Sequence, residues 1–155
     1  MGFYLPGELI GLDAIAEVKY YNTAKALETS SLCEIPYDKV TSLSQSIHNL
    51  QLHMYRLLST EIKEDQELQM LLGKKTAEER IASFLFNLSE RYRARHLSAT
   101  RFRLPMVRTD IANYLGLAVE TTSRIFTRLQ QQNVLKVDGK EVEIIDAHQL
   151  CKMAS

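Results

Sequence analysis

The most regular pattern of apolar and polar positions lies between residues 46 and 72, where apolar side chains recur every three or four residues. This stretch contains neither proline nor glycine, so its spacing predicts one long α-helix that Gly73 would end. Two faces of the helix carry apolar side chains. The first face is formed by Ile47, Leu50, Met54 and Leu57. The second, whose steps of three and four residues match coiled-coil a and d positions, is formed by Tyr55, Leu58, Ile62, Asp65, Gln69 and Leu72.

A helix with two such faces needs two packing partners, and one of them can be its own domain. We interpret the second face as a dimerisation surface that meets the same helix of a second chain. Asp65 interrupts this face, and in a two-fold dimer it would lie near its symmetry mate, where like charges oppose association. The alternative is that Asp65 points to solvent and Gln69 marks the end of the face, and the sequence leaves both open.

The residues before this helix have the composition of strands and turns. Apolar runs at residues 3–5 and 32–35 flank turn residues such as Pro6 and Gly7, and a helix is expected to begin near Tyr37. So few strands cannot close a sheet of their own. We therefore expect residues 1–45 to be part of a larger β domain, followed by the dimerisation helix at 46–73 and a third unit at 74–155.

The third unit begins with a helix that Thr76 can cap and that continues to about Arg93, with acidic residues in its first turn. Its apolar face is formed by Ile81, Phe84, Leu85 and Leu88. Residues 102–106 then predict a short strand, and Pro105 places this strand at the edge or end of a sheet.

Residues 108–129 have the pattern of a helix, a tight turn and a second helix. Thr109 or Asp110 can cap the first helix, and Gly116 can end it in the left-handed conformation. The second helix is expected at residues 119–131, with Ile125 and Leu129 on its buried face. Two short apolar runs then flank residues 138–140, Asp-Gly-Lys, and predict a β-hairpin. A hairpin after such a helix pair predicts a winged helix.

The charge distribution along the chain indicates an anionic partner for this unit. Although the formal net charge is zero, residues 74–136 contain twelve basic and five acidic residues, a local net charge of +7. Such a positive field attracts the phosphates of double-stranded DNA. The exposed start of the second helix offers Glu120, Ser123 and Arg124 on one side, and these side chains can read base edges. The alternative is an intrahelical salt bridge between Glu120 and Arg124, and the two interpretations are compatible.

Other classes of function find little support in the composition of the 155 residues. The first residues lack the features of a secretory signal, and there is no apolar run long enough for a membrane span, so a cytoplasmic location is expected. Cys33 and Cys151 form no disulfide or metal pattern. No nucleophile, carboxylate pair or phosphate loop appears at a catalytic spacing, so we expect no enzyme. The main rival is a winged-helix module that serves protein interaction without sequence-specific DNA binding.

The chain resembles the CRP/FNR superfamily, and within it the oxygen-responsive fumarate and nitrate reduction regulator branch. The motifs that carry the resemblance lie at residues 26–36, 78–82 and 110–124. The resemblance implies a mostly α fold with small β elements: a remnant of a cyclic-nucleotide-binding-like β-roll, a long dimerisation helix and a carboxy-terminal winged helix-turn-helix. It also implies a homodimer that binds palindromic DNA and takes part in anaerobic or redox gene control.

The resemblance further implies roles for single residues. Glu120, Ser123 and Arg124 correspond to the base-reading residues, and Val119 matches the branch that prefers TTGAT-type to TGTGA-type half-sites. Thr122 departs from the larger aliphatic residue usual at its position, which puts the packing behind the reading residues in doubt. Contacts with the DNA backbone, or support of the reading residues, are expected from Arg108, Thr109, Thr121 and Arg128.

The same resemblance bears on cofactors and partners. Cys33 corresponds to one of four cysteine ligands of a [4Fe-4S] cluster in the full-length form, and the other three would lie in an amino-terminal segment that this sequence does not contain. We therefore expect no cofactor in this chain. Asn22 and Thr23 stand where the cyclic-AMP branch has a phosphate-binding arginine and serine, so no cyclic nucleotide is expected to bind. The loop at residues 94–100 is where contact with RNA polymerase is expected.

Overall fold

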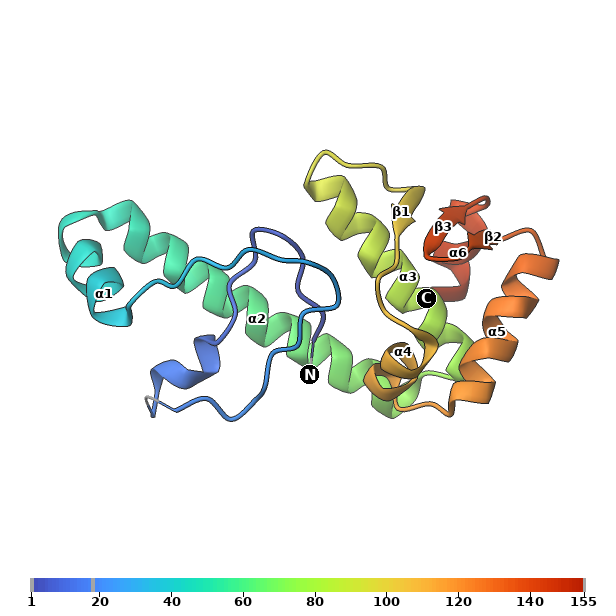
Figure 1. Ribbon diagram of the computed structural model, residues 1–155, viewed down its shortest axis with the longest axis horizontal. Helices are drawn as coiled ribbons and strands as arrows, with labels where there is room; N and C mark the ends of the chain where they lie inside the picture. The colour runs from blue at the N-terminus through green and yellow to red at the C-terminus, as the bar shows by residue number, and fades with distance from the viewer. Residues whose placement is uncertain (1, 18, 155) are drawn as a thin grey trace. The chain divides into compact units, whose positions relative to one another are not determined.

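The computed structural model of the protein describes residues 2–17 and 19–154 and divides into two compact units, Met1–Leu68 and Gln69–Ser155 (Figure 1). The described residues form six α-helices, one short 3-10 helix and one three-stranded sheet, so the fold is mostly α with small β elements, as the sequence predicts.

The first unit contains the 3-10 helix η1 (Leu12–Ile15), helix α1 (Tyr37–Ser46) and the larger part of helix α2 (His48–Lys74). The prediction of a turn at Pro6 and Gly7 is confirmed, because the N–H of Glu8 donates to the carbonyl of Leu5 at 3.1 Å. The prediction of strands is wrong for residues 2–17 and 19–36, none of which forms a strand. A strand needs a neighbour for its backbone hydrogen bonds, and apolar runs by themselves do not supply one.

Helix α2 begins two residues later than expected because Ile47, with φ −115° and ψ 90°, separates it from α1. The prediction that Gly73 ends the helix is wrong, since α2 continues through Gly73 to Lys74. No residue of α2 is buried among the described residues. On the predicted dimerisation face, Tyr55 and Ile62 are each 59% exposed, whereas Leu58 and Leu72 are half-buried.

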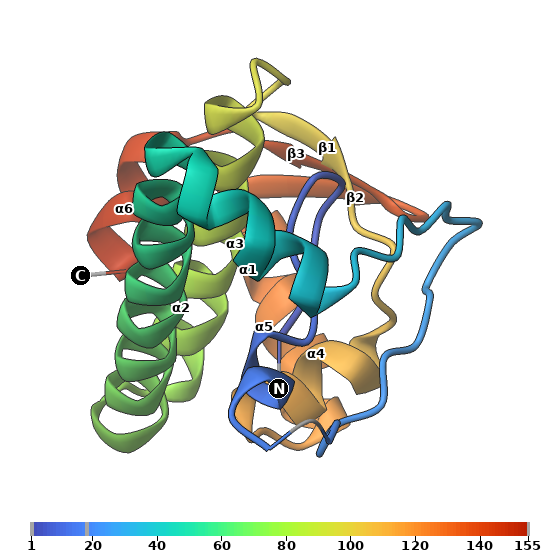
Figure 2. The same cartoon turned by 90° about the vertical axis from the view of Figure 1, so that its left-hand side faces the viewer.

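The second unit contains the end of α2, four more helices and the sheet. Its helices are α3 (Ala77–Ala94), α4 (Arg108–Leu115), α5 (Val119–Gln131) and α6 (Ala147–Ala154), and its strands are β1 (Arg101–Arg103), β2 (Leu135–Asp138) and β3 (Glu141–Ile144). The sheet is antiparallel in the order β1-β3-β2, with Asp138 opposite Glu141 at the tip of the predicted hairpin. Figure 2 shows the strands above α4 and α5.

The core of this unit confirms most of the expected apolar faces. Ile81 and Leu85 of α3, Leu115 of α4 and Leu129 of α5 are completely buried. The strand expected at 102–106 is shorter, because the chain leaves β1 after Arg103 and approaches Pro105, which has no N–H to donate.

The sequence reasoning missed helix α6, which packs against α3 through the completely buried Leu150. A local signal was present, because the carboxylate of Asp146 accepts a hydrogen bond from the N–H of Gln149 at 2.8 Å. An aspartate placed in this way is a common helix N-cap.

The start of α3 is fixed by a capping box, as the sequence indicates at Thr76. The N–H of Glu79 donates to Thr76 Oγ1 at 3.4 Å, and the N–H of Thr76 donates to Glu79 Oε2 at 2.6 Å. Together the two side chains satisfy backbone donors that the first turn of a helix leaves without partners.

We expect Glu79→Gln to lower the free energy of unfolding at neutral pH and to have less effect in acid. The hydrogen bonds from the backbone N–H and the hydroxyl of Thr76 hold the pKa of Glu79 below its ordinary value of 4.5. A carboxyl with a lowered folded-state pKa stabilises the protein above its unfolded-state pKa, and this contribution is lost as the pH falls through the folded-state pKa. Urea unfolding at several pH values should show the two stabilities converging below about pH 4.5. A difference independent of pH would contradict the role of the ionised carboxylate.

Candidate nucleic-acid interface

The helix-turn-helix is formed by α4, a tight turn and α5. Gly116 has φ 61° and ψ 41°, the left-handed conformation expected of it, and the N–H of Leu117 donates to the carbonyl of Ala112 at 2.9 Å. The prediction that Thr109 or Asp110 caps the first helix is confirmed for Asp110, although α4 begins earlier than expected and its N-cap position is Val107. Asp110 lies inside the first turn, where its carboxylate accepts from the N–H of Val107 at 3.1 Å.

The rotation of α5 about its axis is fixed by its buried side, which consists of Thr122, Ile125, Phe126 and Leu129. Thr122 is completely buried, and its hydroxyl donates to the carbonyl of Ala118 at 3.1 Å. The hydroxyl therefore has a partner, so threonine at this position leaves no unsatisfied polar group behind the reading residues.

The three predicted base-reading residues lie on the exposed side of α5, because Glu120, Ser123 and Arg124 are all exposed. Arg124 donates from Nη2 to the hydroxyl of the half-buried Thr121 at 3.3 Å. Within residues 2–17 and 19–154 it forms no ion pair with Glu120, so the intrahelical salt bridge is not formed. The structure therefore presents a carboxylate, a hydroxyl and a guanidinium side by side on the first two turns.

Arg128 lies one turn beyond Arg124 but has a different environment. Its Nη1 atom lies 2.7 Å from Oε2 of Glu78, in the first turn of α3. Sequence reasoning missed this ion pair because fifty residues separate the partners. Both arginines line a cavity of about 400 Å³ together with Thr76, Ala77, Glu78, Thr121 and Ile125.

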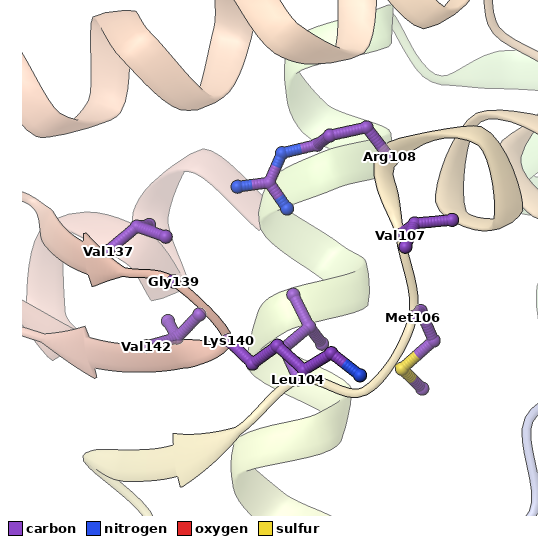
Figure 3. A pocket seen from close by; sticks show the side chains of 8 residues that line it. All are labelled: Leu104, Met106, Val107, Arg108, Val137, Gly139, Lys140 and Val142. Atoms are coloured by element: carbon purple, nitrogen blue, oxygen red, sulfur yellow. The ribbon is translucent and has the colours of Figure 1, made fainter. Parts of the chain in front are cut away.

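Arg108, expected to contact or support the DNA interface, packs on the face of an aromatic ring. Its guanidinium carbon lies 3.6 Å from the centre of the Phe126 ring on α5, and burial lowers the pKa of Arg108. Figure 3 shows the side chain extending from the start of α4 toward Val137. It lines a cavity of about 350 Å³ between this segment and the β2–β3 hairpin, to which Lys140 also contributes. The neighbouring Thr109 is exposed.

We expect the contact between Arg108 and Phe126 to couple α4 to α5 by about 0.5 to 1 kcal/mol, as a cation over an aromatic face does at a partly exposed site. Urea unfolding of Arg108→Met, Phe126→Leu and the double variant measures this coupling as the deviation from additivity. Strictly additive losses would show that the two side chains are stabilised independently.

Comparison with known proteins places this unit in a family. Residues 79–153 match the model of the Crp-like helix-turn-helix domain. The transcriptional activator protein anr of Pseudomonas aeruginosa is 53% identical over 153 residues, which cover 99% of this chain and 63% of that protein. The chain belongs to the CRP/FNR superfamily.

Further relatives place it in the fumarate and nitrate reduction regulator branch of the CRP/FNR superfamily. The transcriptional activator protein FnrA of Stutzerimonas stutzeri is 54% identical over 99% of this chain and 63% of that protein. The fumarate and nitrate reduction regulatory protein of Yersinia pestis is 49% identical over 99% of this chain and 61% of that protein. The chain thus spans about three fifths of the length of these relatives. They are regulators, in agreement with the expectation that the chain is not an enzyme.

Solved structures of the CRP/FNR superfamily have the same fold. FixK2 from Bradyrhizobium japonicum is 28% identical, with a TM-score of 0.69 over 76% of this chain and 58% of that chain. A CooA mutant from Carboxydothermus hydrogenoformans is 19% identical, with a TM-score of 0.61 over 77% of this chain and 55% of that chain. At this identity the second comparison supports the fold alone.

The residues of this chain do not fit the iron-sulfur cluster that the resemblance implies for the full-length form. Cys33 is exposed and unpaired, and no group of three or more histidine, cysteine, aspartate or glutamate side chains in the described part of the chain could hold a metal ion. A [4Fe-4S] cluster needs four ligands, and Cys33 supplies one.

Among the described helices, none is long and apolar enough to cross a membrane.

Proposed function

We propose that the protein is a sequence-specific DNA-binding transcription regulator that binds palindromic TTGAT-type half-sites as a homodimer in anaerobic or redox gene control. The observation that carries the proposal is the exposed start of α5, where Glu120, Ser123 and Arg124 face solvent while the opposite side of the helix is buried in the core. The names of the relatives, which include transcriptional activators and an anaerobic regulatory protein, support it.

The chemistry of the three side chains suits the edges of base pairs in the major groove. The guanidinium of Arg124 can donate two parallel hydrogen bonds to O6 and N7 of guanine, and the carboxylate of Glu120 can accept from N4 of cytosine. Ser123 can donate to a base or a phosphate. Because α5 follows α4 across a tight turn, it corresponds to the recognition helix that enters the groove.

The partly exposed a and d face of α2 supports the homodimer. A two-fold protein dimer matches a palindromic site, since each chain then reads one half-site in the same way. The apolar side chains Tyr55, Leu58 and Ile62 lose contact with water when two such helices pair, which favours association. Asp65 is also exposed on this face, and its negative charge opposes association of the two helices.

We expect Asp65→Ala to increase the dimer fraction, because the substitution removes two like charges from the paired helices. Sedimentation of both proteins over a concentration series measures the dimer fraction. Glu67→Ala is the control, since it also removes an acid from α2 but lies outside the a and d positions. Equal dimer fractions for wild type and Asp65→Ala would place Asp65 in solvent, as the alternative interpretation has it.

We also propose that the loop at residues 94–100 contacts RNA polymerase. Its exposed Leu97 and Ser98 and the left-handed backbone of His96, with φ 59°, give it a defined protruding surface. Substitution of Leu97 by serine should reduce polymerase recruitment in a promoter-binding assay and leave DNA affinity unchanged. Unchanged recruitment would exclude this side chain from the contact.

Fluorescence anisotropy over a salt series tests the proposed function on three duplexes: a TTGAT-type palindrome, a TGTGA-type palindrome and a scrambled sequence. We expect the first to bind most tightly at every salt concentration. Equal and steeply salt-dependent affinities for all three would leave only phosphate attraction. The absence of binding to any duplex would favour a protein-interaction module.

A further inference from the structure

Helix α5 carries two arginines at successive turns of one face, and their partners differ. Arg124 donates to the uncharged hydroxyl of Thr121. Arg128 forms a charge-assisted hydrogen bond with the carboxylate of Glu78, at 2.7 Å. Residues four apart lie on the same side of a helix, so both guanidinium groups border the same DNA-facing surface. Of these two arginines, Arg128 has an acidic partner, and Arg124 has none among the described residues.

The backbone that carries Glu78 is fixed at the start of α3. Glu78 is the second residue of α3, and the capping box between Thr76 and Glu79 fixes the start of that helix. Its side chain is 32% exposed, whereas that of Arg128 is 54% exposed. The more buried partner is therefore the acid, and it holds the longer side chain against α3.

We propose that Glu78 is a positioning residue that withholds Arg128 from the DNA backbone. The inference rests on the proposed function, because it concerns how the same interface binds DNA. In the bound state Arg124 contributes to sequence preference, and the pair formed by Glu78 and Arg128 spans α3 and α5 as a neutral unit. The chain then binds DNA less tightly than its arginines allow, and its sequence preference is unaffected by the pair.

The salt dependence of binding separates this arrangement from the expected phosphate contact. Each phosphate neutralised by a basic side chain steepens the slope of log affinity against log salt by about 0.9. A neutral ion pair releases no counterions. Removal of the whole pair therefore leaves the slope unchanged if Arg128 is withheld, and makes it shallower by about 0.9 per bound chain if Arg128 contacts a phosphate.

The experiment measures these slopes for the full chain on the TTGAT-type palindrome and on the scrambled duplex. We expect Glu78→Gln to free Arg128, to tighten binding to both duplexes by the same factor and to steepen the slope by about 0.9 per bound chain. A fourfold rise in salt should then weaken this variant, relative to the wild type, about 3.5-fold more if one chain is bound and about 12-fold more if a dimer is bound. The double variant Glu78→Gln with Arg128→Gln should return to the wild-type slope. Glu90→Gln is the control: it removes a carboxylate paired with Arg93 at the other end of α3, and should leave the slope unchanged.

A shallower slope for the double variant would overturn the inference and make Arg128 a phosphate contact. An unchanged slope for Glu78→Gln would also overturn it, because Glu78 would then withhold no charge from the DNA. Thermal unfolding monitors the fold of each variant, and a merely structural role of the pair would move the melting temperature without moving the slope. The proposed function fails separately: if the wild type binds the palindrome and the scrambled duplex equally, the slopes on the scrambled duplex still decide the role of Glu78. If neither wild type nor Glu78→Gln binds any duplex, both proposals are wrong.

Discussion

Replacement of Arg124 by alanine is expected to remove most of the preference for the palindromic site. A bidentate contact between arginine and guanine contributes about 1 to 3 kcal/mol of discrimination, so the loss per half-site is about 5- to 150-fold. A dimer on a palindrome suffers this loss in both half-sites. The measurement is the ratio of affinities for the TTGAT-type palindrome and the scrambled duplex at one fixed salt concentration.

Arg124→Lys is the matched variant, because it keeps the positive charge but lacks the planar fork that binds guanine with two donors. We expect it to lose nearly as much preference as alanine while it retains the affinity of the wild type for the scrambled duplex. If Arg124→Ala weakens binding to both duplexes by the same factor, Arg124 is a phosphate contact and does not read bases.

The sequence predicted the parts of the interface that depend on local signals. The second helix of the helix-turn-helix lies at residues 119–131 as expected, because its start and its buried face depend on residues within two turns of each other. Gly116 was identified for the same reason, since a left-handed residue after a short helix has a clear preference for glycine. The hairpin that follows was also predicted from its own turn residues.

The sequence could not predict contacts between residues that only the fold brings together. Glu78 lies 50 residues from Arg128, and spacing along the chain contains no information about that pair. Charge counting treats Arg128 and Arg80 as parts of a basic field available to phosphate, and Glu78 only as one of the five acids that reduce it. Strand composition is misleading at residues 2–17 and 19–36 for a related reason: apolar runs indicate what a strand can contain, whereas the partner strand decides whether it forms.

Arg80 gives the clearest case of a charge used within the fold. Its guanidinium donates to the carbonyl of Leu72 at 2.7 Å and to those of Lys75 and Leu115 at 3.0 Å each. Leu72 lies in the last turn of α2, Lys75 follows that helix directly, and Leu115 is the last residue of α4, next to Gly116. Helix carboxyl ends have carbonyls without partners and a partial negative charge, so one cation stabilises both. This arrangement also explains why α2 ends without a left-handed glycine.

We expect Arg80→Met to lower the free energy of unfolding by about 3 kcal/mol, because hydrogen bonds to a charged group contribute about 1.5 to 3 kcal/mol each and do not add fully. The free energy of unfolding of Arg80→Lys should lie between those of the wild type and Arg80→Met, since one ammonium group cannot replace a planar guanidinium that donates to three carbonyls. Urea unfolding with an unchanged m-value measures the loss. The control is Arg93→Met, whose exposed ion pair with Glu90 should contribute less than about 0.5 kcal/mol. If both methionine variants lose equally little, water satisfies the three carbonyls and the turn of the helix-turn-helix is held by its apolar core alone.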